Sequence, residues 1–129
     1  MDILTKAVQP SSRLELRDAN DEIIAGVAVT VYGPGSKQYA SAQARQSNRL
    51  IDKLKSKGKT DQTAEQKAAE TAEFLADITV SFENLDYKDL EGRALALAVY
   101  SDVSIGFIAD QVAKHCGDWS NFTKPDMKS

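Results

Sequence analysis

Apolar and polar residues alternate along the first part of the chain and later follow a helical period. In residues 13–17, Leu14 and Leu16 alternate with charged side chains, as in a strand with one solvated face. Residues 23–32 are rich in β-branched side chains, and Val27, Val29 and Val31 fall on one face. Between the two, residues 18–22 are mainly Asp and Asn, which bond to their own backbone in turns. This pattern predicts a β-hairpin that helices must cover, because a hairpin alone is marginally stable.

A Gly-Pro-Gly corner at 33–35 ends the second strand and leads into a polar helix. Ser36 is placed to cap that helix by accepting a bond from a free backbone N–H. The helix is predicted to run to about residue 57, where lysines and Gly58 suit a helix end. Its stripe at helical spacing consists of Tyr39, Ala42, Gln46, Leu50 and Leu54, widened by Ile51.

Three further helices are predicted after this one. A capping box at 63–66 places the start of the second helix near residue 61. Residues 78, 80 and 82 alternate as a strand would, but the helical stripe stays in phase, and we predict helix to about Phe82. Residues 94–100 predict a short buried helix after a loop at 84–92. Asp102 then caps the last helix, which Gly117 ends; its inward residues are Val103, Phe107, Ile108, Val112 and Cys116.

These elements predict a single α+β domain, mostly helical, with an N-terminal β-hairpin packed on helices. With 129 residues there is room for one core. We expect a flexible N-terminal arm at 1–11, the domain at 12–122 and a flexible C-terminal tail at 123–129. Aromatic residues make up only 7%, and alanine fills many apolar positions. Small side chains bury little area each, so we expect self-association to assist stability.

The charge distribution and the hydropathy of the chain limit the classes of partner that we expect. The net charge of −3 comes from 19 acidic and 16 basic residues mixed along the chain, unlike the basic stripe of a nucleic-acid-binding protein. The single cysteine excludes an internal disulfide framework. Neither a secretory signal nor an apolar run near the ~18 residues of a membrane span is visible. We therefore expect a soluble cytoplasmic protein that binds neither nucleic acid nor membrane.

Two sequence motifs resemble a phosphate-binding loop and a nucleophile–base pair, but neither matches the required pattern. Gly33-Pro34-Gly35-Ser36 joins a strand to a helix, where phosphate loops occur, but it lacks the spacing and the lysine of a nucleotide-binding loop. His115 and Cys116 are adjacent on a helix, where neighbours point about 100° apart, so they cannot form a nucleophile–base pair with each other. His115 is explained as a cation near a helix C-terminus, and Cys116 as a small apolar residue.

Carboxylate pairs are the remaining candidates for acid–base chemistry or for binding a hard cation. Glu70/Glu73 and Asp86/Asp89 sit among polar residues, and we predict that both pairs are solvated surface. The chain has too few soft ligands for a transition-metal site. We predict no catalytic, cofactor-binding or metal-binding residues, and no enzyme activity.

Large aromatics in a C-terminal segment raise a different possibility. Trp119 and Phe122 follow the last predicted helix, where such residues either fold back over the core or form a contact surface. The pattern leaves both alternatives open.

In its order of motifs the chain resembles the tail assembly chaperones of lambdoid bacteriophages and prophages with long, flexible, non-contractile tails. The likeness spans about residues 12–122. It is carried by LELRDA and VTVYGPGS at 14–19 and 29–36, AEFLADITVSFENL at 72–85, and YSD, GFIADQV and DWSNF at 100–102, 106–112 and 118–122. Many relatives carry Trp where this chain has Phe82.

The resemblance implies a non-enzymatic assembly factor that is absent from the mature virion. Such proteins bind the tape measure protein and keep it in solution in the host bacterial cytoplasm until tail tube subunits polymerise around it. The family usually makes a longer form by ribosomal frameshifting, and its added domain recruits the tail tube protein. We expect a homo-oligomer without cofactors. The candidate protein-contact residues are Trp119, Phe122, Leu14, Leu16 and Phe82.

Two other functions compete with this one. A structural head–tail connector or tail completion protein would share the phage context but remain in the virion. A small enzyme or nucleotide-binding domain would need the nucleophile, metal or phosphate motifs that the sequence lacks.

Overall fold

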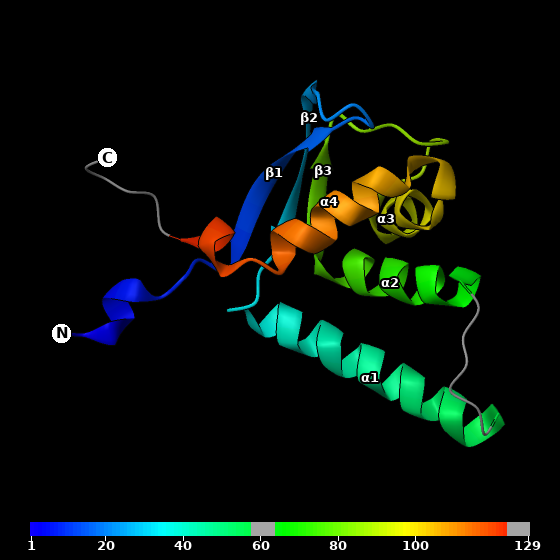
Figure 1. Ribbon diagram of the computed structural model, residues 1–129, viewed down its shortest axis with the longest axis horizontal. Coiled ribbons are helices and arrows are strands. Elements are labelled where there is room, and N and C mark those ends of the chain that lie inside the picture. Colours follow the sequence, from blue (N-terminus) through cyan, green and yellow to red (C-terminus); the bar gives the residue numbers. More distant parts are fainter. Residues whose placement is uncertain (58–63, 124–129) are drawn as a thin grey trace.

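The first two strands form the predicted hairpin, and a third strand joins it from much later in the chain (Figure 1). β1 (Ser11–Arg17), β2 (Ile23–Tyr32) and β3 (Thr79–Glu83) make an antiparallel sheet in the order β1-β2-β3. The computed structural model describes residues 1–57 and 64–123. The helices are α1 (Lys37–Lys57), α2 (Ala64–Ile78), α3 (Gly92–Ser101) and α4 (Gly106–Cys116), with 3-10 turns η1 (Ile3–Lys6), η2 (Val103–Ile105) and η3 (Trp119–Phe122).

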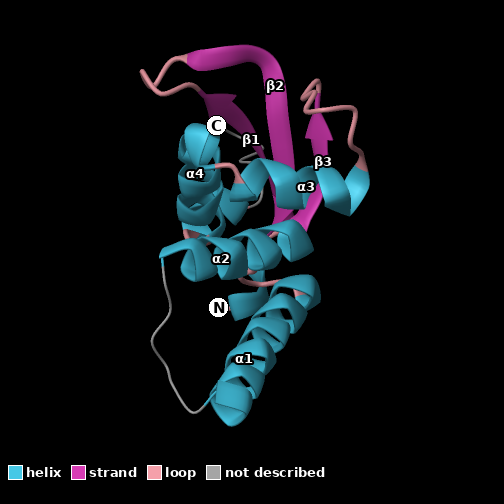
Figure 2. Cartoon of the chain, turned by 90° about the vertical axis from the view of Figure 1, so that its right-hand side faces the viewer, coloured by secondary structure: helices cyan, strands magenta, loops and turns pink. Residues whose placement is uncertain are grey.

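The layers of the molecule follow from the two faces of this sheet. α2, α3 and α4 cover one face, and α1 lies beyond α2, away from the strands (Figure 2). The structure is 56% helical, which confirms a mostly helical α+β domain with its N-terminal hairpin packed on helices. β1 begins at Ser11, two residues before the predicted strand.

Turn chemistry and alternation explain the hairpin. The Asp18 carboxylate accepts bonds from the backbone N–H groups of Asn20 (2.9 Å) and Glu22 (3.1 Å), and the Asp18 N–H donates to the Glu22 carbonyl. Leu14 lies opposite Val29 in the register, on the face that the helices cover. The predicted inward face is therefore confirmed.

The other face of the sheet carries an ion pair that crosses the middle strand. Arg13 Nε of β1 lies 2.8 Å from Glu83 Oε2 of β3, and both side chains are about half exposed. Ala28 of β2 pairs with Glu15 on one side and Glu83 on the other, and it is fully buried although it points to this face. Long charged side chains thus cover the sheet where no helix does.

The predicted end of the second helix is wrong. α2 stops at Ile78, and residues 79–83 form β3 instead of helix to Phe82. Thr79 Oγ1 donates to the Leu75 carbonyl (2.7 Å), and its hydroxyl also lies 2.7 Å from the Tyr100 hydroxyl. Phe82 still packs against the core, opposite Val29. The apolar positions at 78, 80 and 82 therefore fit a strand as well as a helix, and the local pattern does not distinguish the two.

The last predicted helix is also corrected at its start. Asp102 caps the 3-10 turn η2, through a bond from the Ser104 N–H (2.9 Å), and α4 begins only at Gly106. Val103, predicted to point inward, is 85% exposed because the 3-10 turn changes its direction. The other four predicted positions are buried or packed against the core, and Gly117 ends the helix as expected.

The apolar stripe of α1 is buried in the first half of the helix and exposed in the second half. Ser36 Oγ accepts a bond from the Tyr39 N–H (3.1 Å), which confirms the predicted cap. Ala42 is fully buried against α2, whereas Leu50 and Ile51 are exposed. The predicted start of the next helix near residue 61 and the glycine at 58 lie outside the described residues.

Within the described residues no single helix is long and apolar enough to cross a membrane. α3 and the segment Val103–Cys116 reach that length and composition only together, as a pair bent by 82°, and their inner faces form the core.

Candidate protein-contact surfaces

Trp119 and Phe122 lie in one 3-10 turn and have opposite environments. Asp118 starts η3 by accepting bonds from the Ser120 N–H (3.0 Å) and hydroxyl (2.7 Å), which lower the pKa of its carboxyl group. Phe122 is 1% exposed, whereas Trp119 is 57% exposed. Each of the two alternatives for this segment therefore applies to one aromatic residue. Phe122 folds back into the core, and Trp119 lies on the surface.

Phe122 packs directly on the glycine corner. A Cβ at Gly33 would collide with the Phe122 ring, so this position requires glycine for close approach. The Gln9 N–H donates to the Phe122 carbonyl (2.6 Å), and the Gly33 N–H donates to the Pro10 carbonyl (2.9 Å). The corner was predicted as a turn and a cap; it also joins the N-terminal segment, β2 and η3.

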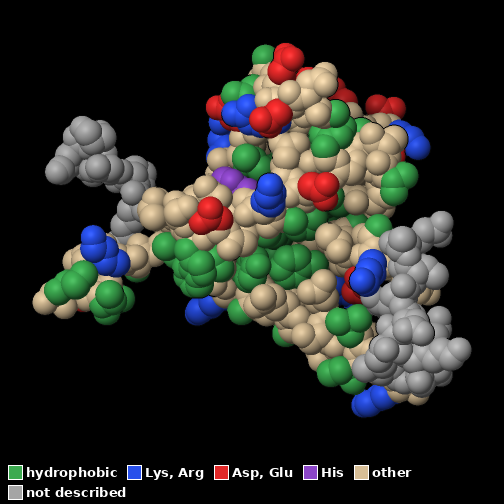
Figure 3. All heavy atoms as spheres, viewed as in Figure 1, with side chains coloured by type: hydrophobic (Ala, Val, Ile, Leu, Met, Phe, Trp, Pro, Cys, Tyr) green, Lys and Arg blue, Asp and Glu red, His purple; other side chains and the backbone are tan. Residues whose placement is uncertain are grey.

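Trp119 adjoins the same corner on its exposed side. A Cβ at Gly35 would lie 2.6 Å from Val8 Cγ2 and 3.5 Å from Trp119 Cζ3, so both side chains pass over this glycine. We call Val8, Gly35 and Trp119 the corner surface. Hydrophobic side chains form a broad band across this view of the molecule, between α4 and α1 (Figure 3). A large exposed aromatic on a rigid support is typical of a protein-contact site.

The three other predicted contact residues lie in or against the core. Leu16 is fully buried, and Leu14 and Phe82 are half-buried. The Phe82 ring lies 5.8 Å from the ring of Tyr100. Of the five candidates, Trp119 is the one whose side chain is mostly accessible to a partner.

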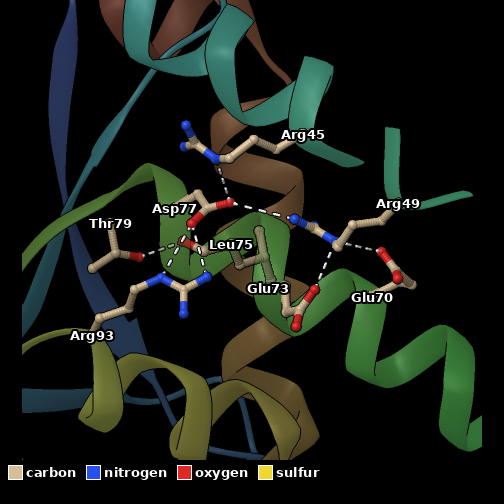
Figure 4. A network of polar contacts seen from close by, with 8 residues as sticks. All are labelled: Arg45, Arg49, Glu70, Glu73, Leu75, Asp77, Thr79 and Arg93. Atoms are coloured by element: carbon tan, nitrogen blue, oxygen red, sulfur yellow. Dashed lines mark hydrogen bonds and ion pairs between the residues drawn. The ribbon is translucent and has the colours of Figure 1, made fainter. Parts of the chain in front are cut away.

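A buried carboxylate ties three helices together, and the sequence pattern did not reveal it (Figure 4). Asp77 of α2 is 7% exposed. It lies 3.2 Å from Arg45 Nε of α1 and 3.0 Å from Arg93 Nη2 of α3. Arginine groups that satisfy a buried carboxylate offset its desolvation. Residues separated by 16 and 32 positions meet here, so no local period marks the cluster.

Arg49 extends this cluster and corrects a prediction. Its Nε lies 3.1 Å from Glu70 Oε2 and 2.6 Å from Glu73 Oε2 (Figure 4). Glu70 is buried, so this pair is not the solvated surface that we predicted. Asp86 and Asp89 are exposed, as predicted.

His115 and Cys116 point into different environments, as their adjacency predicted. Burial raises the pKa of the Cys116 thiol to about 11, consistent with a small apolar core residue. His115 Nε2 lies 3.0 Å from Ser12 Oγ, and its ring stands 5.6 Å from that of Phe122. Burial lowers the pKa of His115 and so disfavours the cation that we predicted at the helix end.

Large apolar side chains that do not belong to the corner surface are also exposed. Their positions on loops, a helix end and a strand edge carried no sequence signal that separated them from core residues. They are Met1, Ile3, Leu4, Ile23, Leu50, Ile51, Val80, Leu90 and Val103. Within residues 1–57 and 64–123, no group of three or more His, Cys, Asp or Glu side chains is arranged to hold a metal ion.

Comparison with family models, with curated proteins and with solved structures finds no match to this chain.

Proposed function

We propose that this protein is a phage tail assembly chaperone that binds the tape measure protein and keeps it in solution while the tail tube polymerises. It acts in the host bacterial cytoplasm as a homo-oligomer and does not stay in the virion. A longer frameshifted form would recruit the tail tube protein. The partner and the setting come from the resemblance in the sequence; the structure supplies surfaces suited to protein contact.

The three stretches that carry the resemblance lie next to one another in the fold, so the likeness concerns one contiguous part of the molecule. The first covers β1, β2 and the glycine corner, and the second covers the end of α2 and β3. The third runs through α4 to η3. Strand pairing and the packing of Phe122 on Gly33 bring them together. The outer end of α1, where Leu50 and Ile51 are exposed, belongs to none of them.

The exposure of Trp119 is the observation that carries the proposal of a contact function. Full burial of a large apolar side chain contributes about 1.5–3 kcal/mol, and Trp119, which is 57% exposed, forgoes part of that free energy. Trp119 lies next to the glycine corner, where Phe122 packs on Gly33 and its carbonyl accepts a bond from the Gln9 N–H. The backbone that carries the Trp119 side chain is therefore fixed in position. Binding an apolar face of a partner polypeptide would recover that energy.

Co-expression with the tape measure protein of the same phage tests the proposal. The wild-type chain should raise the soluble fraction of the tape measure protein and co-purify with it. Trp119→Ala should remove most of that effect while the thermal midpoint stays close to wild type, because the side chain is mostly exposed. Val103→Ala is the control, since it truncates another exposed apolar side chain, on η2, which is 85% exposed against 57% for Trp119.

Two results would overturn the proposal. One is a tape measure protein whose solubility does not depend on the wild-type chain. The other is mass spectrometry of purified virions that finds the chain in stoichiometric amounts, which would identify a retained connector or completion protein. If Trp119→Ala and Val103→Ala behave alike, the corner surface is not the contact site.

A further inference from the structure

The outer edge of β3 is open. β3 pairs with β2 on one side, and among the described residues no strand pairs with its other side (Figures 1 and 2). The register with β2 shifts between Thr30 and Val31, which places Val80 in a bulge, 47% exposed. An edge strand carries backbone donors and acceptors that another chain can pair with.

A groove of about 770 Å³ runs beside this edge. Its walls are the end of α2, β3, the following loop at 84–91 and the first turns of α3. Apolar side chains contribute, among them Val80 and Phe82 from β3, Leu90 from the loop and Leu95 from α3. Val80 and Leu90 are exposed, so the groove offers apolar surface directly beside an unpaired strand.

The charges around the groove decide what could occupy it. Asp86, Asp89 and Glu91 line it and are exposed, and none of them forms an ion pair within the described part of the chain. Arg93 also lines the groove, but its guanidinium is held by Asp77. The nearby Lys88 has its ammonium group over the Tyr87 ring, 5.3 Å from the ring centre. The rim therefore carries three carboxylates that have no ion-pair partner among the described residues.

We propose that the β3 edge and this groove bind an extended, basic segment of a partner polypeptide. Its backbone would pair with β3 as an added strand, and its apolar side chains would contact Val80 and Leu90. Its lysines or arginines would lie against Asp86, Asp89 and Glu91. This surface is separate from the corner surface, so the inference does not depend on the proposed function.

A labelled peptide of alternating character provides the probe. We would measure fluorescence anisotropy of Lys-Val-Thr-Val-Lys-Val-Thr-Lys on the full chain, with Glu-Val-Thr-Val-Glu-Val-Thr-Glu as the charge-reversed twin. The basic peptide should bind saturably and the acidic twin should not. Amide NMR shifts on binding should concentrate at residues 79–93. Binding of both twins alike, or shifts spread over other elements, would overturn the proposal.

Two groove variants separate charge from edge pairing. Asp86→Asn, Asp89→Asn and Glu91→Gln together should weaken binding about tenfold, since exposed ion pairs each contribute modestly. The charge-matched control is Glu22→Gln, Asp52→Asn and Asp110→Asn, whose side chains are exposed on the hairpin turn, α1 and α4. If the control triple weakens binding equally, the attraction is only that of the net charge and the groove is not a site.

The edge variant is Val80→Lys, because a lysine on an edge strand opposes strand addition. It should abolish binding of the basic peptide, whereas Val103→Lys, at an exposed position on η2, should leave binding unchanged. Trp119→Ala should also leave it unchanged, which separates this surface from the one that the proposed function uses. If Val80→Lys instead changes the oligomeric state and leaves peptide binding intact, a second copy of the chain occupies the edge and the proposal is wrong.

Discussion

The two edges of the sheet differ in how far side chains from other elements contact them. At the β1 edge, the Gln111 side chain of α4 accepts a bond from the Arg17 N–H (2.7 Å) and donates to the Arg17 carbonyl (2.6 Å). His115 of the same helix reaches Ser12, also in β1. At the β3 edge, Val80 is exposed beside an open groove. Side chains of α4 thus contact the β1 edge at two positions, whereas no strand among the described residues pairs with the outer edge of β3.

The difference shows how a small domain protects one edge and keeps the other accessible. Gln111 carries a donor and an acceptor on one amide, so it satisfies both backbone groups of Arg17 as a neighbouring strand would. β3 is limited only by its five-residue length and its bulge, which discourage uncontrolled pairing without covering the strand. Selective contact is therefore expected at β3.

The largest test of the comparison is Phe122→Ala. Phe122 is buried between Gly33 and the ring of His115, near the β1 edge. Truncation of a buried Phe costs about 3–5 kcal/mol of stability. Urea denaturation should show that loss. Val80→Ala at the open edge should change the free energy of unfolding by less than about 0.5 kcal/mol. Equal losses at the two sites would mean that Val80 is not free in solution.

Gln111→Ala gives an intermediate effect. It removes two hydrogen bonds to the Arg17 backbone, each contributing about 0.5–1.5 kcal/mol, so we expect a loss of about 1–3 kcal/mol. Amide hydrogen exchange at Arg17 should also become faster. Lys114→Ala, an exposed position on the same helix, is the control and should leave both measurements unchanged. Unaltered exchange in Gln111→Ala would show that α4 covers this edge without the amide.

The smallest expected effect is the pH dependence of stability that His115 causes at the β1 edge. Burial lowers the pKa of His115 below its ordinary value of 6.5, although Asp118 opposes the shift. Below pH 6.5 the unfolded chain then binds this proton more readily than the folded one. The stabilisation is complete above pH 6.5 and declines as the pH falls toward the folded pKa. From pH 7.5 to 5, the wild type should lose more stability than His115→Gln; parallel curves would contradict this.

Local chemistry explains which elements could be predicted. The hairpin follows from alternation and from the Asp18 turn, and the start of α1 from Ser36 after the glycine corner. The short helix at Gly92–Ser101 and the end of α4 at Gly117 follow from apolar spacing and glycine. Each of these signals lies within a few residues of the element that it predicts.

The errors arise where distant residues decide. β3 forms because β2 offers an unpaired edge, and Thr79 pairs with Val31, 48 positions earlier, a choice that the local apolar period cannot express. The Asp77 cluster likewise depends on how α1, α2 and α3 pack. The sequence indicated that Trp119 and Phe122 form a notable pair, but which ring is buried depends on the space above Gly33.

The bond from Gln9 to the Phe122 carbonyl has a practical consequence for anyone handling this protein. It holds the start of β1 and the last turn of the described chain against one another. A fluorophore attached beside Gln9 or Phe122 would consequently lie close to Trp119, where it can shield the indole or provide a false ligand. A cysteine introduced for labelling at an exposed α1 position such as Asp52 would report on binding without that interference.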